Sequence, residues 1–124
     1  MKRDMDLIRK LALAIEVSVT QIDSTLLLID GFTPEQIGYH LELMVEAKLI
    51  VAIDATHLGS RYPEMIVTRL SSRGHDFVDA ARDDTIWKKS LATIRTTVGT
   101  TTISVLLEYL KAEIRRTLGM PAAP

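Results

Sequence analysis

Cysteine is absent from the sequence. Its absence excludes disulfide bonds, thiolate metal sites and a cysteine nucleophile, and it fits a reducing compartment. Long apolar runs are absent too, since no stretch reaches the roughly 18 uncharged apolar residues of a membrane-spanning helix. Near the start, Asp4, Asp6 and Arg9 interrupt the continuous apolar region that a signal peptide would need. We therefore expect a soluble, unprocessed protein of the cytoplasm with no membrane partner.

The sequence also lacks a strong excess of either charge. It has 15 lysines and arginines against 16 aspartates and glutamates, a formal net charge of −1. No global basic field therefore draws the protein to nucleic acid or to an acidic membrane, and any such binding would have to be local. The length of 124 residues, 47% of them hydrophobic, suffices for one core with little left for a second.

Recognisable catalytic motifs are missing as well. There is no glycine-rich phosphate loop, and the three histidines fall on different predicted elements without the spacing of metal ligands. Asp76, Asp79 and Asp83 would share one helical face, which favours a solvated acidic surface over a magnesium site. We expect no enzyme activity, no metal and no cofactor.

The first 50 residues predict two helices with a short strand between them. Apolar residues recur at helical spacing across residues 4–17, which indicates an amphipathic helix. Thr33 can cap a second helix that begins at Pro34 and runs to about Ala47. Between them, the apolar run Leu26 to Ile29 predicts a short strand closed by a turn, although the run is too short to exclude a helix.

The rest of the chain predicts a β-hairpin followed by two helices. Residues 49–55 and 64–71 are two β-rich runs, separated by a loop that contains glycine, serine and proline. Ser71 or Ser72 can cap a long helix that extends to Val98, with a heptad seam along one side. Gly99 can end or bend that helix, and a last amphipathic helix follows to Leu118.

The element order is that of a winged helix: helix, short strand, helix and β-hairpin wing, here followed by two C-terminal helices. The predicted fold class is α+β, mainly α. We expect a winged-helix domain over residues 1–72, a C-terminal helical extension over 73–120 that serves packing or dimerisation, and a disordered tail over 121–124.

Three stretches resemble a family of small phage- and prophage-associated winged-helix proteins of unknown function. They are MKRDMDLIRK at residues 1–10, YHLELMVEAKLI at 39–50 and RLSSRGHDFVDAARDDTIWKK at 69–89. Together they span most of the first 90 residues, and the opening stretch and RDDTIW are fairly specific. The resemblance implies a winged-helix fold, but it implies no established activity, ligand or catalytic residue.

The chain departs from that family at two positions. Lys48 stands where the family usually has glycine, and Ser72 stands where it usually has tryptophan. If Lys48 adopts a left-handed backbone, it carries a strain of roughly 1 kcal/mol that glycine would avoid.

The second helix and the hairpin are the parts of a winged helix that commonly contact DNA. Residues 33–48 have a net charge of −2, and residues 49–70 sum to zero. This opposes binding, because neutralised phosphates supply much of the affinity for duplex DNA. The candidate contacts with bases or phosphates are Gln36, Tyr39, His40, His57, Arg61 and Arg69. For Tyr39 and His40, packing or a half-exposed surface position is the ordinary interpretation.

Two functions stay open from the sequence. The first is a non-enzymatic DNA-binding transcriptional regulator of phage or prophage type, with double-stranded DNA as its partner. The second is a protein–protein interaction adaptor that uses the winged helix and the C-terminal helices without binding DNA. Surface charge discriminates between them: protein partners are favoured if Glu35, Glu42 and Glu46 dominate the exposed surface of the second helix.

The C-terminal helices carry an apolar seam that needs a partner. Folded back about Gly99, they would form a hairpin in which Asp84 lies near Arg115 or Arg116. Paired with a second copy, they would form a two-fold dimer, and we expect this homodimer by analogy with regulators that add helices to a winged domain. The seam residues are Phe77, Trp87, Leu91, Ile94, Leu107, Leu110 and Ile114.

Overall fold

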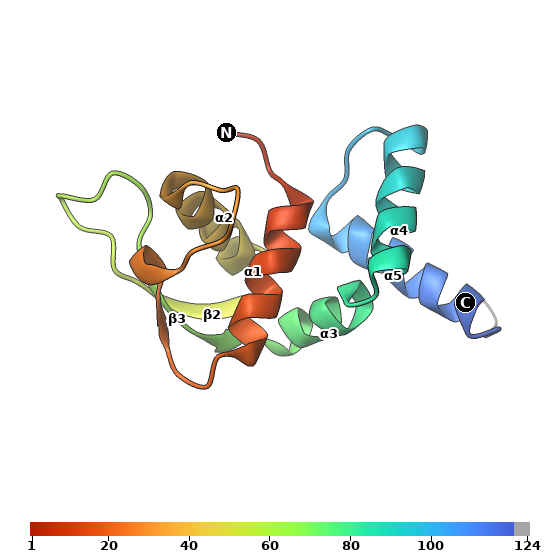
Figure 1. Cartoon of the computed structure of the whole chain (residues 1–124), viewed down its shortest axis with the longest axis horizontal. Coiled ribbons are helices and arrows are strands. Elements are labelled where there is room, and N and C mark those ends of the chain that lie inside the picture. The colour runs from red at the N-terminus through yellow and green to blue at the C-terminus, as the bar shows by residue number, and fades with distance from the viewer. Residues whose placement is uncertain (121–124) are drawn as a thin grey trace. The chain divides into compact units, whose positions relative to one another are not determined.

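The protein is α+β and mainly helical, with a small antiparallel sheet within its first 70 residues (Figure 1). The structure is a computed structural model that describes residues 1–120. It divides into two compact units, Met1–Val78 and Asp79–Pro124. The division falls within a helix, a few residues after the predicted boundary at 72. Within the described residues, no helix is both long enough and apolar enough to cross a bilayer.

The first helix, α1, spans Met5–Val17, as its amphipathic pattern predicts. Asp4 caps it, because one of its carboxylate oxygens accepts a hydrogen bond from the backbone N–H of Leu7 at 3.2 Å. Its buried residues are Leu7, Ile8, Leu11, Ala12 and Ile15. This single stripe on a helix with a polar opposite face fixes which side of α1 faces the core of the first unit.

The sheet has three strands in the order β1-β3-β2, and both pairings are antiparallel. The hairpin strands β2 (Ile50–Asp54) and β3 (Met65–Leu70) confirm the two β-rich runs. The third strand, β1, is only Ile22–Asp23, and Ile22 lies opposite Val67. The hairpin register is irregular between Val51 and Ala52, as expected for the local twist of a β-bulge.

The predicted strand at Leu26 to Ile29 is wrong. The strand lies earlier in the chain, and the 3-10 turn η1, Ser24–Leu26, follows it at once. Asp23 caps the start of this turn, because its carboxylate accepts hydrogen bonds from the backbone N–H and the hydroxyl of Thr25, at 2.9 and 2.7 Å. Within the apolar run, Leu26 is 76% and Leu28 83% exposed, while Leu27 and Ile29 are half-buried, so hydrophobicity alone did not mark the strand.

The second helix, α2, spans Pro34–Glu46 and confirms the predicted start and end. Thr33 and Gln36 form a capping box: the Thr33 hydroxyl accepts from the Gln36 backbone at 3.2 Å, and the Gln36 side chain accepts from the Thr33 backbone at 2.8 Å. Two donors at the helix start are thereby satisfied. The buried face of α2 consists of Ile37, Gly38, His40, Leu41 and Met44.

A left-handed residue joins α2 to the hairpin. Lys48 has φ +62°, so it adopts the left-handed backbone on which the strain at this position depends. The backbone of Leu49 returns to the carbonyl of Met44 at 2.9 Å, so the chain reverses within three residues after the helix. Ser71 completes the junction, because its hydroxyl donates to the Lys48 carbonyl and accepts from the Gly74 N–H.

The single long helix predicted after the hairpin is in fact two helices. They are α3, Ser72–Ala81, and α4, Asp84–Thr97. Asp83 separates them, because its backbone is extended (φ −74°, ψ 121°) and its carboxylate accepts from the Ile86 N–H at 2.9 Å. The apolar seam continues across the break at nearly helical spacing, which is why periodicity missed it. Three helices therefore follow the hairpin in the described residues.

The second unit contains a helical hairpin. Gly99 ends α4 with φ +81°, and Thr102 caps the last helix, α5, which spans Ile103–Thr117. The two helices pack against each other. Their buried residues are Trp87, Ser90, Leu91, Ile94, Ile103, Leu106, Leu107, Leu110 and Glu113. The tail predicted over residues 121–124 lies outside the described residues.

Candidate interaction surface

The exposed side of α2 is acidic. Glu35, Tyr39, Glu42 and Glu46 follow one another at spacings of four, three and four, so they form a single stripe along the helix. The three glutamates are exposed and the tyrosine is half-buried. The opposite side of the helix packs into the core, so this stripe is the surface that α2 presents to solvent.

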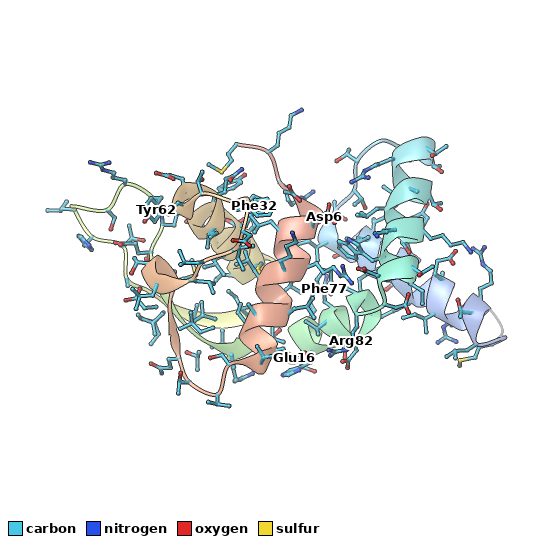
Figure 2. All side chains as sticks on the ribbon, viewed as in Figure 1. Asp6, Glu16, Phe32, Tyr62, Phe77 and Arg82 are labelled. Atoms are coloured by element: carbon cyan, nitrogen blue, oxygen red, sulfur yellow. The ribbon has the colours of Figure 1, made fainter. Side chains whose placement is uncertain are left out.

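The loop of the hairpin folds back onto α2 at a glycine. A β-carbon on Gly38 would lie 2.6 Å from the Pro63 carbonyl oxygen and 3.0 Å from the ring of Tyr62. Figure 2 shows Tyr62 beside α2. Gly38 thus permits an approach that any side chain would block, and the loop and the helix together enclose a groove.

This groove, the α2–hairpin groove, has a volume of about 220 Å³. Its apolar lining comes from Val45, Ala52, Pro63 and Met65, and its charged lining comes from Glu42, Glu46 and Asp54. No lysine or arginine is among these lining residues. The apolar surface is thus bordered by carboxylates on both the helix and the first hairpin strand.

Asp54 is held in its charged form at the end of β2. The Thr56 backbone N–H donates to its carboxylate at 2.9 Å, and this bond, together with the Thr56 hydroxyl, lowers the pKa of the Asp54 carboxyl below its ordinary value. A carboxyl with a lowered pKa keeps its negative charge further into the acidic range. Asp54 is therefore an anion throughout the neutral range.

His40, predicted as a DNA contact, is a core residue. Only 1% of it is exposed. Its Nε2 accepts a hydrogen bond from the Asp4 backbone N–H at 2.8 Å, and its Nδ1 lies 2.7 Å from the Gln36 carbonyl oxygen. Because Nε2 is the acceptor, Nδ1 carries the proton and donates it to that carbonyl. The ring ties the start of α1 to α2 and cannot reach a ligand, which corrects the prediction.

The other predicted DNA contacts are spread over three elements. Gln36 and Tyr39 are half-buried on α2, and the Gln36 side chain is already engaged in the capping box. Arg61 is exposed in the hairpin loop, next to the Tyr62 that approaches α2. Arg69 is exposed on β3, opposite Val51, and donates to the Leu70 carbonyl at 2.9 Å. Of these residues, only Gln36 and Tyr39 lie together on α2.

His57, the last of these residues, belongs to a hydrogen-bonded network in the hairpin loop. Its Nδ1 accepts from the Gly59 N–H at 3.1 Å, and its Nε2 lies 3.1 Å from a Glu64 carboxylate oxygen. The Ser60 hydroxyl donates to the same carboxylate. The His57 ring and the Ser60 hydroxyl both bind this glutamate, and the His57 backbone N–H donates to the Ser60 hydroxyl at 3.0 Å. The network gives the loop a defined shape.

Most of the predicted C-terminal seam is covered within one chain. Phe77, Trp87, Leu91, Ile94, Leu107 and Leu110 are buried, and Ile114 is half-buried. Sequence reasoning missed Glu113, a carboxylate that is only 6% exposed on α5. Arg116 of α5 lies 2.6 Å from it and Lys89 of α4 lies 3.4 Å from it, so this ion pair network links the two helices.

The described residues contain no group of three or more histidine, aspartate or glutamate side chains placed to hold a metal ion. The expected absence of a metal or cofactor stays an expectation drawn from the sequence.

These elements define the class of the protein. It is a small, mainly helical α+β protein with an acidic groove between a helix and a β-hairpin. Comparison with known proteins gives the family: a model described as Hypothetical protein (DUF2513) matches residues 2–101, so the chain belongs to this family. It is also similar to an uncharacterized protein of Haemophilus influenzae (strain ATCC 51907 / DSM 11121 / KW20 / Rd), with 35% identity over 114 residues and 90% of each chain covered. No solved structure matches the chain.

Proposed function

We propose that the protein is a non-enzymatic winged-helix adaptor that binds another protein through the α2–hairpin groove. The winged-helix assignment is supported by the element order α1, β1, η1, α2, β2, β3 and by a short first strand that completes the hairpin sheet. In a DNA-binding helix-turn-helix, the helix before the recognition helix crosses the DNA backbone. Here that position is occupied by the three-residue turn η1, which is too short to do so.

The observation that carries the proposal is the charge of the α2 stripe. Glu35, Glu42 and Glu46 are exposed on the side that would enter a major groove, and no basic residue belongs to that stripe. DNA presents a high density of negative phosphates, and binding to it draws largely on cations that replace its counterions. Three carboxylates on the entering helix oppose that interaction, whereas a protein partner can present the complementary charge.

Duplex DNA is the second candidate function, and one observation favours it. The hydrogen bond from the Asp4 N–H to His40 ties the residue that follows Lys2 and Arg3 to α2, and Arg61 lies in the loop whose Tyr62 and Pro63 approach the same helix. These cations could contact phosphates while Tyr39 faces a base. The contact would nevertheless have to form beside the acidic stripe.

The proposed setting follows from the sequence resemblance. The likeness to phage- and prophage-associated proteins supports a role in phage or prophage biology, inside the cytoplasm. The homodimer predicted from the C-terminal helices is part of the proposal too, although most of the seam that suggested it is buried within one chain. A sedimentation-equilibrium mass of one chain would contradict the dimer and leave the adaptor function intact.

Binding to random-sequence duplex DNA tests the proposed function. Fluorescent duplex would be titrated with the protein at 50 mM and 200 mM salt and followed by anisotropy. A protein that makes six to ten phosphate contacts loses about 10³- to 10⁵-fold in affinity over this range. We expect no binding at either salt concentration. Tight binding at low salt that collapses at high salt would overturn the adaptor in favour of a DNA-binding regulator.

A further inference from the structure

We propose that the α2–hairpin groove takes a short segment of a partner protein that carries one apolar side chain flanked by lysine or arginine. This inference rests on the proposed adaptor function and names the chemistry of the partner. It commits to a basic peptide segment as the occupant, because the groove is apolar inside and acidic at its border.

The size of the groove indicates a side chain and not a small molecule. Sites that enclose a drug-sized ligand or cofactor typically have volumes of about 300–1,000 Å³. The α2–hairpin groove has about 220 Å³. Val45, which is 39% exposed, gives it an apolar wall that a single aliphatic side chain can cover. Peptide recognition commonly combines such an apolar anchor with flanking polar contacts.

The charge of the border selects a basic partner. Glu42 and Glu46 lie one turn apart on α2, and Asp54 faces the same groove from β2. The surrounding unit, Met1–Val78, has eight basic residues against eleven acidic ones, so its wider field has the same sign. Phosphates and acidic peptides are repelled by this arrangement, whereas a lysine or arginine on each side of the anchor meets a carboxylate.

The groove is also held in shape before any partner arrives. The close approach of Pro63 to Gly38 fixes the loop against α2. Glu64, the next residue, is anchored by the Ser60 hydroxyl and by His57, and its backbone carbonyl accepts from the Ala55 N–H at 2.9 Å. A preformed groove loses little conformational entropy when it binds, which favours affinity for a short segment.

The test is a titration of the full chain with fluorescein-labelled peptides, followed by anisotropy. The first probe has a central leucine flanked on each side by two arginines, and the second has glutamates in place of the arginines. Two variants are compared with the wild type. Glu42→Gln/Glu46→Gln neutralises the groove, and Glu35→Gln is the matched control, because it neutralises an exposed glutamate of the same helix outside the groove lining. Circular dichroism establishes that each variant is folded.

The inference predicts that the arginine peptide binds and the glutamate peptide does not. Neutralising the groove should weaken binding about threefold to tenfold, the range expected for two solvent-exposed charge pairs. Glu35→Gln should change it by less than about twofold. Binding that both variants retain equally would overturn the groove assignment and leave the adaptor function standing. If the arginine peptide does not bind, the assignment of the groove to a basic segment is overturned. The adaptor function is tested separately, by the DNA titration.

A second copy of the chain is the competing occupant. A wild-type mass of two chains that falls to one chain in Glu42→Gln/Glu46→Gln, but not in Glu35→Gln, would assign the groove to self-association and overturn the partner segment. Equal masses for all three proteins, together with peptide binding that depends on the groove carboxylates, would support the inference.

Discussion

Lys48 is the described non-glycine residue with a positive φ, at +62°, and it stands where the resembling family usually has glycine. An L-residue in this region is strained, and glycine is not. Lys48→Gly should raise the free energy of unfolding by roughly 1 kcal/mol, with a melting temperature a few degrees higher. Thermal unfolding followed by circular dichroism measures this. Lys48→Ala removes the same charge but keeps the strain, so it should give no such gain. An unchanged or lower melting temperature for Lys48→Gly would contradict the strain.

Gly74 is required by contact and not by its backbone angles. A β-carbon there would lie 1.9 Å from the Leu49 carbonyl oxygen, a backbone atom that cannot move without disturbing the junction after α2. Gly74→Ala should lower the free energy of unfolding by about 2 kcal/mol or more, in the range of an overpacked core. Urea unfolding would measure the loss. Ser72→Ala, at an exposed position of the same helix, is the control, and equal stability of the two variants would refute the close contact.

At the residue scale, the sequence predicted backbone roles better than side-chain roles. The Thr33 cap followed from local rules that act within a few residues, and the left-handed Lys48 was suggested by the glycine that the resembling family usually has there. The hydrogen-bond partner of the His40 ring did not follow from such rules, because Asp4 is 36 residues away in the chain. The same holds for Gly38, whose neighbour Pro63 comes from the hairpin loop. Long-range partners of this kind are invisible to periodicity.

The break between α3 and α4 depends on one capping side chain. Asp83 accepts a hydrogen bond from the Ile86 N–H at 2.9 Å, and removal of an N-cap costs typically about 1 kcal/mol. Asp83→Ala should therefore destabilise the protein by about 1 kcal/mol, whereas Asp83→Asn should keep most of the stability, since asparagine caps equally well. Chemical unfolding of the two variants checks this. If Asp83→Asn loses as much as Asp83→Ala, charge and not capping is responsible.

At the element scale, errors arose where two signals competed. The run Leu26 to Ile29 is apolar enough for a strand. However, the observed strand β1 ends at Asp23, where the turn stabilised by the Asp23 side chain begins, before the run is reached. Apolar residues continue at helical spacing on both sides of residue 83, which predicted one helix. The helix is nevertheless interrupted there, because Asp83 caps the start of α4. Where start signal and periodicity agreed, as for α2 and the hairpin strands, the predicted and observed bounds coincide within one or two residues.

At the scale of the whole molecule, charge is distributed unevenly although the total is nearly neutral. The unit Met1–Val78 carries a formal net charge of −3, with eight basic and eleven acidic residues, and the rest of the chain carries +2, with seven and five. The sequence predicted the acidity of α2, because a helix of known start places its glutamates on known faces. It did not predict the groove, because Pro63 and Met65 meet α2 only in three dimensions.

The most direct measurement of where partners bind is a pair of NMR titrations on ¹⁵N-labelled protein. One titration adds the arginine–leucine peptide, and the other adds random-sequence duplex DNA at 50 mM salt. An adaptor with the proposed groove predicts amide shifts confined to residues 42–46, 52–54 and 64–65 with the peptide, and none with DNA. Shifts with DNA centred on Gln36, Tyr39 and Arg61, with the groove silent to the peptide, would contradict it and assign the surface to nucleic acid.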